Sequence, residues 1–240
     1  RQIKFVKSLQ QKKNRIKHES FVIESHKNVL ELLSSDHEIL QLFATKNWIE
    51  ENKIDNSVSS NEVSEKELQR MSSLKTASDV LVVVKIPFQK DKKFNFDGVN
   101  IILDEIKDPG NLGTIIRICD WFGVENIYCS KTTVDIYNPK VVQATMGSIS
   151  RVNVFYTNLL DLFKQIPKTV NIYGTFIDGE NLNNVIIEGS SLVVFGNESK
   201  GISESLESKL TNRISINKKG TAESLNVAIS TGIVLNKFCD

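Results

Sequence analysis

From residue 99 onward, short apolar runs alternate with segments of helical periodicity, and this alternation constrains the fold more than any other feature. We expect strands at 100–105, 126–129, 152–155, 171–175, 192–195 and 213–216. We expect helices at 112–122, 139–146, 159–165 and 203–210, and a last apolar helix near the C-terminus. The alternation predicts an α/β domain with a mostly parallel sheet covered by helices. Ligands of such sheets bind beyond the carboxyl ends of the strands.

The residues before this domain predict a second, smaller α/β unit. We expect a helix over 1–18, strands at 21–23, 38–43 and 81–84, and helices at 26–33 and 47–52. Ser64 and Glu67 have the spacing of a capping box, which predicts another helix after a polar loop at 55–63.

A polar, charged stretch at 87–97 separates the two parts of the chain. It begins with proline and lacks helical periodicity, so we interpret it as a linker. We therefore predict two domains, at 1–91 and 92–240.

Three polar loops are expected at the carboxyl ends of strands, and the first has the sequence DPGNLG followed by TIIR. Pro-Gly favours a tight turn, and Asn111 can cap the helix that follows. Arg117 lies six residues later, about one and two-thirds helical turns along, so it can project near the same end. An ion pair with Asp104, Glu105 or Asp120 is the structural alternative for this arginine.

The second loop, GNESKGI, follows the apolar strand predicted at 192–195. Its glycines, Gly196 and Gly201, frame Glu198, and glycine lets a ligand or another backbone approach closely. The loop is neither G-x-G-x-x-G nor a Walker loop, which disfavours a nucleotide-phosphate cradle and a Rossmann dehydrogenase. Capping and interaction with the helix dipole is the structural alternative for Glu198.

The third loop, KKGTAESLN, joins the last strand to the C-terminal helix. Most chains fray at their ends, whereas an apolar helix that starts with polar residues indicates burial near a functional site. Ser224 can be the N-cap of this helix and Asn226 an early helical residue, so structural roles explain both residues taken singly. Three such loops at one edge of a sheet favour a shared site.

The remaining composition limits the functional classes. Three scattered cysteines predict no disulfide framework and favour a reducing cytosol. No apolar run approaches the ~18 residues of a membrane helix, and the first residues do not resemble a signal peptide. With three histidines and no Cys-x-x-Cys, we expect no metal site. Hydrolysis by a Ser-His-Asp triad is disfavoured because a G-x-S-x-G elbow is missing.

Together, the three loops resemble the motifs of the SpoU (TrmH-type) branch of the SPOUT RNA 2′-O-ribose methyltransferases. Asn111 with Arg117 is similar to motif 1, and FGNExxGI at 195–202 to motif 2. Motif 3 is matched by ISI at 214–216 and SLNVA at 224–228. The N-terminal part resembles the L30-like substrate-binding domain of family members through SLQxKKxR and FVIE, although serine precedes FVIE where the family more often has glycine.

The resemblance implies a C-terminal deep trefoil knot, S-adenosylmethionine held largely by backbone groups, and a homodimer with its active site near the subunit interface. The implied catalytic residues are Asn111, Arg117, Glu198, Ser224 and Asn226. The implied cofactor-binding residues are Thr175, Phe176, Gly196, Gly201, Ile216 and Leu225. A basic run before the first acid at Glu19 suits RNA phosphates, or else a solvated helix face. The RNA-binding candidates in this run are Lys4, Lys12, Lys13 and Arg15.

We therefore predict S-adenosylmethionine-dependent methylation of an RNA ribose 2′-hydroxyl in the cytoplasm, on a guanosine or uridine of large-subunit ribosomal RNA. The two-domain layout favours ribosomal RNA over transfer RNA, and it fits a resistance methyltransferase equally well. A non-catalytic RNA-binding module on the same scaffold is the alternative, which the intact motif residues disfavour. In the family, an arginine at the position of Arg117 is often assigned as the general base. Since a guanidinium holds its proton above about pH 12, positioning the hydroxyl is physically easier.

Overall fold

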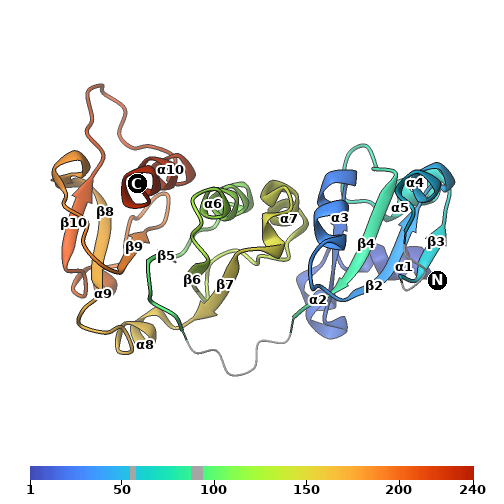
Figure 1. The fold of residues 1–240 in the computed structure, drawn as a ribbon, viewed down its shortest axis with the longest axis horizontal. Coiled ribbons are helices and arrows are strands. Elements are labelled where there is room, and N and C mark those ends of the chain that lie inside the picture. The colour runs from blue at the N-terminus through green and yellow to red at the C-terminus, as the bar shows by residue number, and fades with distance from the viewer. Residues whose placement is uncertain (55–57, 88–93) are drawn as a thin grey trace. The chain divides into compact units, whose positions relative to one another are not determined.

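The computed structural model describes residues 1–54, 58–87 and 94–240, which form two compact units (Figure 1). The predicted boundary between residues 91 and 92 lies outside the described residues, as does part of the predicted linker. The first unit contains the described residues before position 88 together with Asp135–Ser150, and the second contains the rest.

The first unit is built on a four-stranded sheet with the order β1-β4-β2-β3, in which only the β2–β3 pair is parallel. Residues of α1 and α5 pack with Leu81 and Val83 of the central strand on one face, and α3 contacts β1 and β4. Its elements are α1 (Gln2–Ser8), α2 (Lys12–His18), β1 (Ser20–Glu24), α3 (His26–Leu33), β2 (Ile39–Ala44), α4 (Lys46–Asn52), β3 (Ser60–Glu62), α5 (Glu65–Met71), β4 (Val80–Lys85), α7 (Pro139–Thr145) and η1 (Ser148–Ser150).

The single helix predicted over residues 1–18 is wrong, because the chain forms two helices with a break between them. Gln11 has an extended backbone and starts α2. The carbonyls of Leu9 and Gln10 instead accept hydrogen bonds from Nη1 of Arg15, each at 2.9 Å. The buried guanidinium thus satisfies carbonyls that a continuous helix would have bonded internally.

Residues 135–150 were expected within the parallel α/β domain, yet they pack in the first unit. Nη2 of Arg15 lies 2.7 Å from Oδ2 of Asp135 in a largely buried ion pair. The Tyr137 ring stacks at a tilt against Phe21 of β1, with 4.5 Å between centroids. Strand–helix alternation along the chain therefore predicted α7 itself, but not the sheet that it covers.

The second unit contains a six-stranded sheet with the order β10-β8-β9-β5-β6-β7, and every pair in it is parallel. The predicted α/β class with a mostly parallel sheet is confirmed. The elements are β5 (Val99–Leu103), α6 (Pro109–Trp121), β6 (Asn126–Ser130), β7 (Asn153–Thr157), α8 (Leu159–Phe163), β8 (Asn171–Asn181), η2 (Leu182–Asn184), β9 (Ser191–Phe195), α9 (Glu204–Glu207), β10 (Asn212–Ser215) and α10 (Val227–Phe238).

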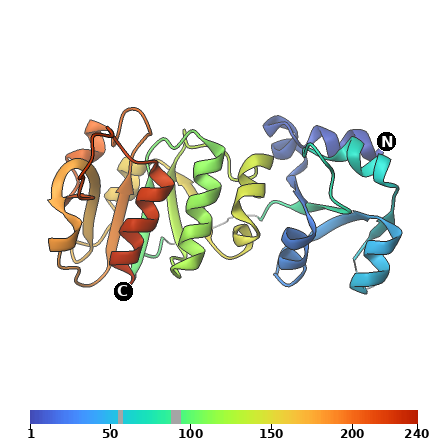
Figure 2. The ribbon, with the colours of Figure 1, turned by 90° about the horizontal axis from the view of Figure 1, so that it is seen from above.

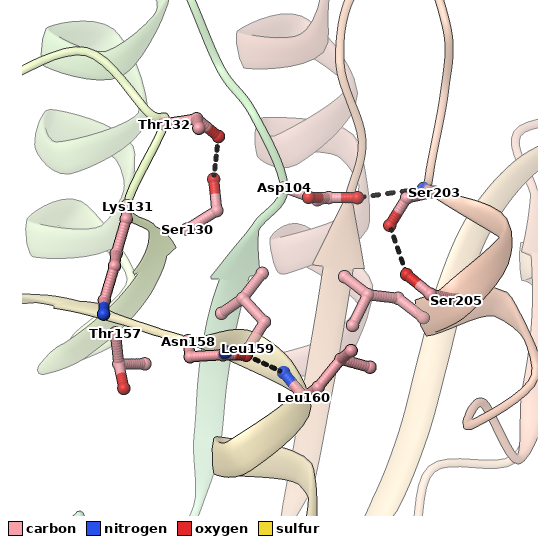
Figure 3. A pocket seen from close by; sticks show the side chains of 11 residues that line it. Asp104, Ser130, Lys131, Thr132, Thr157, Asn158, Leu159, Leu160, Ser203 and Ser205 are labelled. Carbon is pink, nitrogen blue, oxygen red and sulfur yellow. Dashed lines mark hydrogen bonds between the residues drawn. The ribbon is translucent and has the colours of Figure 1, made fainter.

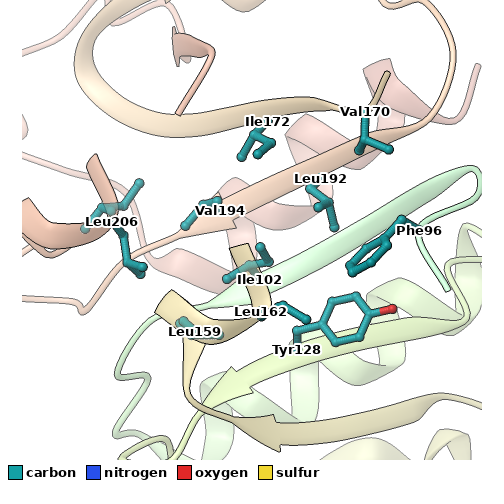
Figure 4. Close-up of a cluster of buried hydrophobic side chains, with 11 residues drawn as sticks. Phe96, Ile102, Tyr128, Leu159, Leu162, Val170, Ile172, Leu192, Val194 and Leu206 are labelled. Atoms are coloured by element: carbon teal, nitrogen blue, oxygen red, sulfur yellow. The ribbon is translucent and has the colours of Figure 1, made fainter. Parts of the chain in front are cut away.

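Alternate residues of the strands face two helical layers. On one face, Ile102 and Val194 pack with leucines of α8 and α9, as Figure 4 shows. The C-terminal helix α10 packs beside α6 (Figure 2), although more than a hundred residues separate the two along the chain. This return brings the last loop to the start of α6, where the first loop lies.

Candidate active site at the carboxyl edge of the sheet

A chain of side-chain hydrogen bonds connects all three polar loops. Nδ2 of Asn111 donates to Oε1 of Glu198 at 3.0 Å. Nδ2 of Asn226 donates to Oδ1 of Asn111 at 2.9 Å. The sequence predicted these three residues for one site, and the fold brings them together from positions up to 115 residues apart. One carboxylate and two amides thus form a continuous polar surface.

The same loops begin two helices, and the capping residues differ from those predicted. Oδ1 of Asp108 accepts from the N–H of Asn111 and caps α6, so Asn111 is a helical residue rather than the cap. Oδ1 of Asn226 accepts from the N–H groups of Ala228 and Ile229 and caps α10. Ser224 is exposed and lies before the cap. The spacing of polar residues suggested both helix starts but could not choose the capping side chain.

Arg117 stays outside this hydrogen-bonded chain. It is exposed on α6, and within the described parts of the chain it forms no hydrogen bond or ion pair. Its alternative partners are engaged elsewhere: Asp120 pairs with Arg151, and the Asp104 carboxylate accepts from a backbone N–H. Six residues of helix rotate a side chain by about 240° from its starting direction. Arg117 therefore lies about 120° around the helix from Asn111, measured the shorter way.

Two of the predicted cofactor residues, Thr175 and Phe176, lie at a gap in the sheet ladder. Pairing of β8 with β10 runs to Gly174, then resumes at Glu180, so residues 175–179 leave the ladder. Pairing of β8 with β9 also ends at Gly174. Thr175 and Phe176 begin this unpaired segment. Neither residue has a Cα partner in the ladders of β8 with β9 and β10, which suits a ligand held by backbone groups.

The other predicted cofactor positions lie on the second and third loops. Among the described residues, the N–H groups of Ile216 and Leu225 have no hydrogen-bond partner. A Cβ atom at Gly196 would lie only 2.1 Å from the carbonyl carbon of Gly201, so the backbone folds tightly back there. Gly201 exchanges both main-chain hydrogen bonds with Asn197. Gly201 thus closes the loop, whereas Ile216 and Leu225 present free donors that fit S-adenosylmethionine.

Glu105 was considered only as an ion-pair partner of Arg117, yet its hydrogen bonds connect its loop to the second loop and to β6. Its φ of 60° is unusual for a residue other than glycine. Its N–H donates to Ser130, its carbonyl accepts from Nδ2 of Asn197, and its carboxylate accepts from Thr132. Nζ of Lys107 lies 3.8 Å from the same carboxylate. A glutamate in a left-handed backbone conformation carries no periodic or motif signal in the sequence.

The basic candidates of the N-terminal unit divide into two kinds. Lys4, Lys12 and Lys13 are exposed on α1 and α2. Arg15 is 3% exposed and bonded to Asp135 and two carbonyls. Its assignment as an RNA contact is therefore withdrawn, because its guanidinium is committed to the interior of its own unit.

None of the helices in the described residues combines the length and apolar character needed to cross a bilayer. In the same parts of the chain, no three His, Cys, Asp or Glu side chains gather where they could hold a metal ion.

Comparison with known proteins follows the division of the chain. Residues 98–236 match the sequence model of the SpoU rRNA Methylase family, and residues 1–82 match that of the MRM3-like substrate binding domain. A 23S rRNA (guanosine(2553)-2'-O)-methyltransferase of Bacillus subtilis is 26% identical over 235 residues, covering 97% of this chain and 94% of that protein. Several other curated relatives are matched over about half of their own length.

Two solved structures have the same fold over nearly the whole of this chain. An RNA methyltransferase of the TrmH family from Porphyromonas gingivalis has a TM-score of 0.88 at 31% identity, covering 99% of this chain and 96% of that one. An AdoMet-bound rRNA methyltransferase from Sinorhizobium meliloti has a TM-score of 0.87 at 27% identity, with coverage of 98% and 92%. The region matched by the first family model contains all three polar loops.

Proposed function

This chain belongs to the SpoU rRNA methylase family, and we propose that it methylates a ribose 2′-hydroxyl of large-subunit ribosomal RNA. The resemblance predicted from the three loops is confirmed. The chain is an S-adenosylmethionine-dependent RNA 2′-O-methyltransferase, as its relatives and an AdoMet-bound neighbour are. Guanosine is the target base that we favour, because the relative that matches the chain over almost its full length acts on a guanosine.

The hydrogen-bonded chain of Glu198, Asn111 and Asn226 is the observation that carries this proposal. A 2′-hydroxyl is a weak nucleophile that must be held in line with the methyl group, so positioning supplies much of the catalysis. Oε1 of Glu198 is engaged by Asn111, and its Oε2 has no partner among the described residues. We assign Oε2 to accept a hydrogen bond from the ribose, with Ser224 as a second hydroxyl ligand of the nucleoside.

S-adenosylmethionine supplies the electrophilic methyl group on a sulfonium. We assign its binding to the unpaired backbone of Thr175 and Phe176 and to the free N–H groups of Ile216 and Leu225. Gly196 lets the second loop fold close enough to complete that wall. The backbone nature of these groups explains why few of them carry a side-chain signature.

We propose that the protein assembles as a homodimer. Exposed apolar side chains lie on the adjacent helices α6 and α10, with Trp121 85%, Ile229 57% and Ile233 39% exposed. Large exposed hydrophobic groups on neighbouring elements are typical of interaction surfaces. Arg117 lies one helical turn before Trp121 and is exposed too, so it would sit within such an interface. There, its guanidinium can bind an RNA phosphate next to the partner's site.

A C-terminal trefoil knot and a cytoplasmic location complete the proposal. From the edge strand β10, the chain returns to pack α10 against α6, and α10 also contacts η2 in the β8–β9 connection. That path supports threading of the terminal helix past the β8–β9 connection. The exposed lysines of α1 and α2 support RNA binding by the N-terminal domain, residues 1–91.

The function is tested by mapping 2′-O-methylation in ribosomal and transfer RNA from cells with and without the gene. We expect one large-subunit nucleotide to lose its methyl group, and purified protein with S-adenosylmethionine to restore it on the RNA. Loss of a methyl group from transfer RNA instead would identify transfer RNA as the substrate. Absence of any change in both RNA classes, together with no transfer in vitro, would refute the proposal.

A further inference from the structure

A cavity separate from the Glu198–Asn111–Asn226 chain lies at the carboxyl edge of the same sheet, on the face covered by α8 and α9. It has a volume of about 230 Å³. Figure 3 shows the side chains that surround it, which project from the ends of β5, β6 and β7 and from the start of α9. The lining combines one carboxylate, one ammonium group and several hydroxyls with leucine side chains. None of the predicted site residues lines it.

Asp104 is the buried charge of this cavity. It is 5% exposed, and its Oδ2 accepts a hydrogen bond from the N–H of Ser203 at 2.9 Å. Among the described residues, its Oδ1 has no hydrogen-bond partner. This oxygen is not one of the described buried atoms that lack a partner, so it is open to solvent in the cavity and available as an acceptor. The cavity is therefore poised to receive an N–H or O–H donor from a ligand.

Lys131 supplies the opposite charge at the rim. It is exposed, follows the end of β6, and forms no hydrogen bond or ion pair within the described residues. Leu159 and Leu160 come from the opposite wall, and Leu160 is 39% exposed. An exposed cation near Asp161, an apolar wall and a carboxylate acceptor match the phosphate, flat face and hydrogen-bonding edge of a nucleotide.

The volume limits the ligand to a small group. Pockets for drug-sized ligands have volumes of roughly 300–1,000 Å³, and this cavity falls below that range. It can admit one base or one sugar, but not a dinucleotide. A ligand whose remainder continues outside, such as one nucleotide of a chain, fits this limit best.

Two loops connect the cavity with the Glu198–Asn111–Asn226 chain. Asp104 begins the loop that ends at Asp108, whose N–H faces Glu198 at 3.4 Å. Four residues span at most about 14 Å. Glu105 ties this loop to the loop of Asn197 and to Ser130, so the two sites form one rigid edge. A single RNA strand can therefore reach both.

We propose that this cavity binds the base of one unpaired nucleotide that neighbours the methylated nucleotide, with Lys131 on its phosphate. Asp104 Oδ1 accepts from an exocyclic amine, so the pocket favours cytosine, adenine or guanine over uracil. The inference rests on the proposed function, since it takes RNA as the substrate. It adds a specificity pocket that reads sequence beside the target.

The test compares Asp104→Asn and Lys131→Met with wild-type protein. Asparagine has the same shape, and its amide oxygen still accepts from Ser203, but it presents a donor instead of an acceptor to the pocket. Lys168→Met is the matched control, because Lys168 is an exposed lysine of the same unit that does not line the cavity. The probe is a large-subunit ribosomal RNA transcript, and the readouts are filter-binding affinity at two salt concentrations and KM for methyl transfer.

We expect Asp104→Asn to weaken RNA binding roughly 10-fold while S-adenosylmethionine affinity stays unchanged. Replacing the neighbouring base by uracil in the transcript should cost wild type about the same factor and the variant much less. Lys131→Met should lower the RNA affinity and should reduce the slope of log affinity against log salt concentration by about one. Lys168→Met should change neither. Unchanged RNA affinity and KM in both pocket variants would overturn the proposal. The binding readout needs no turnover, so it is separate from failure of methyl transfer in wild type, which would instead refute the proposed function.

Discussion

Asn226 combines a structural and a chemical task in one amide group. Its oxygen caps α10 by accepting from Ala228 and Ile229, and its nitrogen donates to Asn111. Serine, threonine or aspartate could cap the helix as well. The amide accepts at the cap through its oxygen and donates to Asn111 through its separate nitrogen, whereas the carboxylate of aspartate can only accept.

Two substitutions at Asn226 should separate these tasks. Asn226→Asp keeps the capping oxygen and removes the donor, so we expect stability within about 0.5 kcal/mol of wild type and a large loss of methyl transfer. Asn226→Ala removes both groups and should also lower the free energy of unfolding by about 1 kcal/mol. Urea unfolding and methyl-transfer assays measure the two effects. Full activity of the aspartate variant would show that the Asn111 contact is dispensable.

Arg117 is exposed, and among the described residues its side chain forms no hydrogen bond or ion pair, so it is available to a ligand. Arg117→Ala should reduce methyl transfer by ~100-fold or more through loss of positioning. Unfolding should change little, because Arg117 forms no hydrogen bond or ion pair with the described residues. Arg117→Lys keeps the charge but not the bidentate fork, so only partial activity is expected. Calorimetry with S-adenosylmethionine should give wild-type affinity for both. Near-normal turnover of the alanine variant would remove Arg117 from the site.

Among the elements, the second loop depends on one close backbone approach. A Cβ at Gly196 would meet backbone atoms of Gly201 and Ile202 at 2.1–2.2 Å, and backbone cannot yield as a flexible side chain can. Gly196→Ala should therefore displace the loop and weaken S-adenosylmethionine binding at least 10-fold by calorimetry. Gly220→Ala is the matched control, since nothing lies within 4 Å of its added carbon. Equal cofactor affinity in both variants would contradict the assigned role of the loop.

The segment 135–150 is held in the first unit by a largely buried ion pair. Asp135→Asn removes the charge that Arg15 faces, leaving a guanidinium that is 3% exposed without its counterion. Breaking a buried pair in this way costs roughly 3–5 kcal/mol. We expect a matching loss in urea unfolding for Asp135→Asn, and a smaller loss for the double variant with Arg15→Met, which leaves no buried charge. Stability near wild type in the single variant would mean that water replaces the partner.

The elements themselves were largely predictable from the sequence, because apolar periodicity and turn residues are local signals. The capping box at Ser64 and Glu67 is confirmed. The signals failed where a distant partner decides the outcome. Arg15 breaks the N-terminal helix through side-chain bonds, and β3 forms in a stretch predicted as a loop because β2 supplies its hydrogen bonds. The resemblance to the SpoU motifs predicted Asn111, Glu198 and Asn226 as site residues, and the fold brings their side chains together. The conformation of Glu105, by contrast, had no sequence signal.

At the scale of the whole molecule, the position of Arg117 supports the proposed homodimer. One chain contains the carboxylate–amide chain and the backbone groups that we assign to the cofactor, whereas Arg117 is exposed on the helix that also carries the exposed Trp121. In the proposed homodimer, the exposed Arg117 of one subunit would face the site of the other. The exposed apolar residues of α6 and α10 provide the surface for such a contact. A two-fold axis would give each site one arginine from its partner.

The dimer and the shared site can be tested together. Ile233→Glu places a charge on the proposed interface and should convert the protein to monomer in sedimentation equilibrium, whereas Ile16→Glu, equally apolar and exposed on α2, should not. An Arg117→Ala chain and an Asn226→Asp chain are each expected to be inactive alone. Mixed one to one, half of the dimers pair the two variants, and each contains one intact site, so about a quarter of the wild-type rate should return. Recovery requires that the arginine act across the interface. Dimers that form normally without any recovery would place Arg117 in its own subunit's site instead.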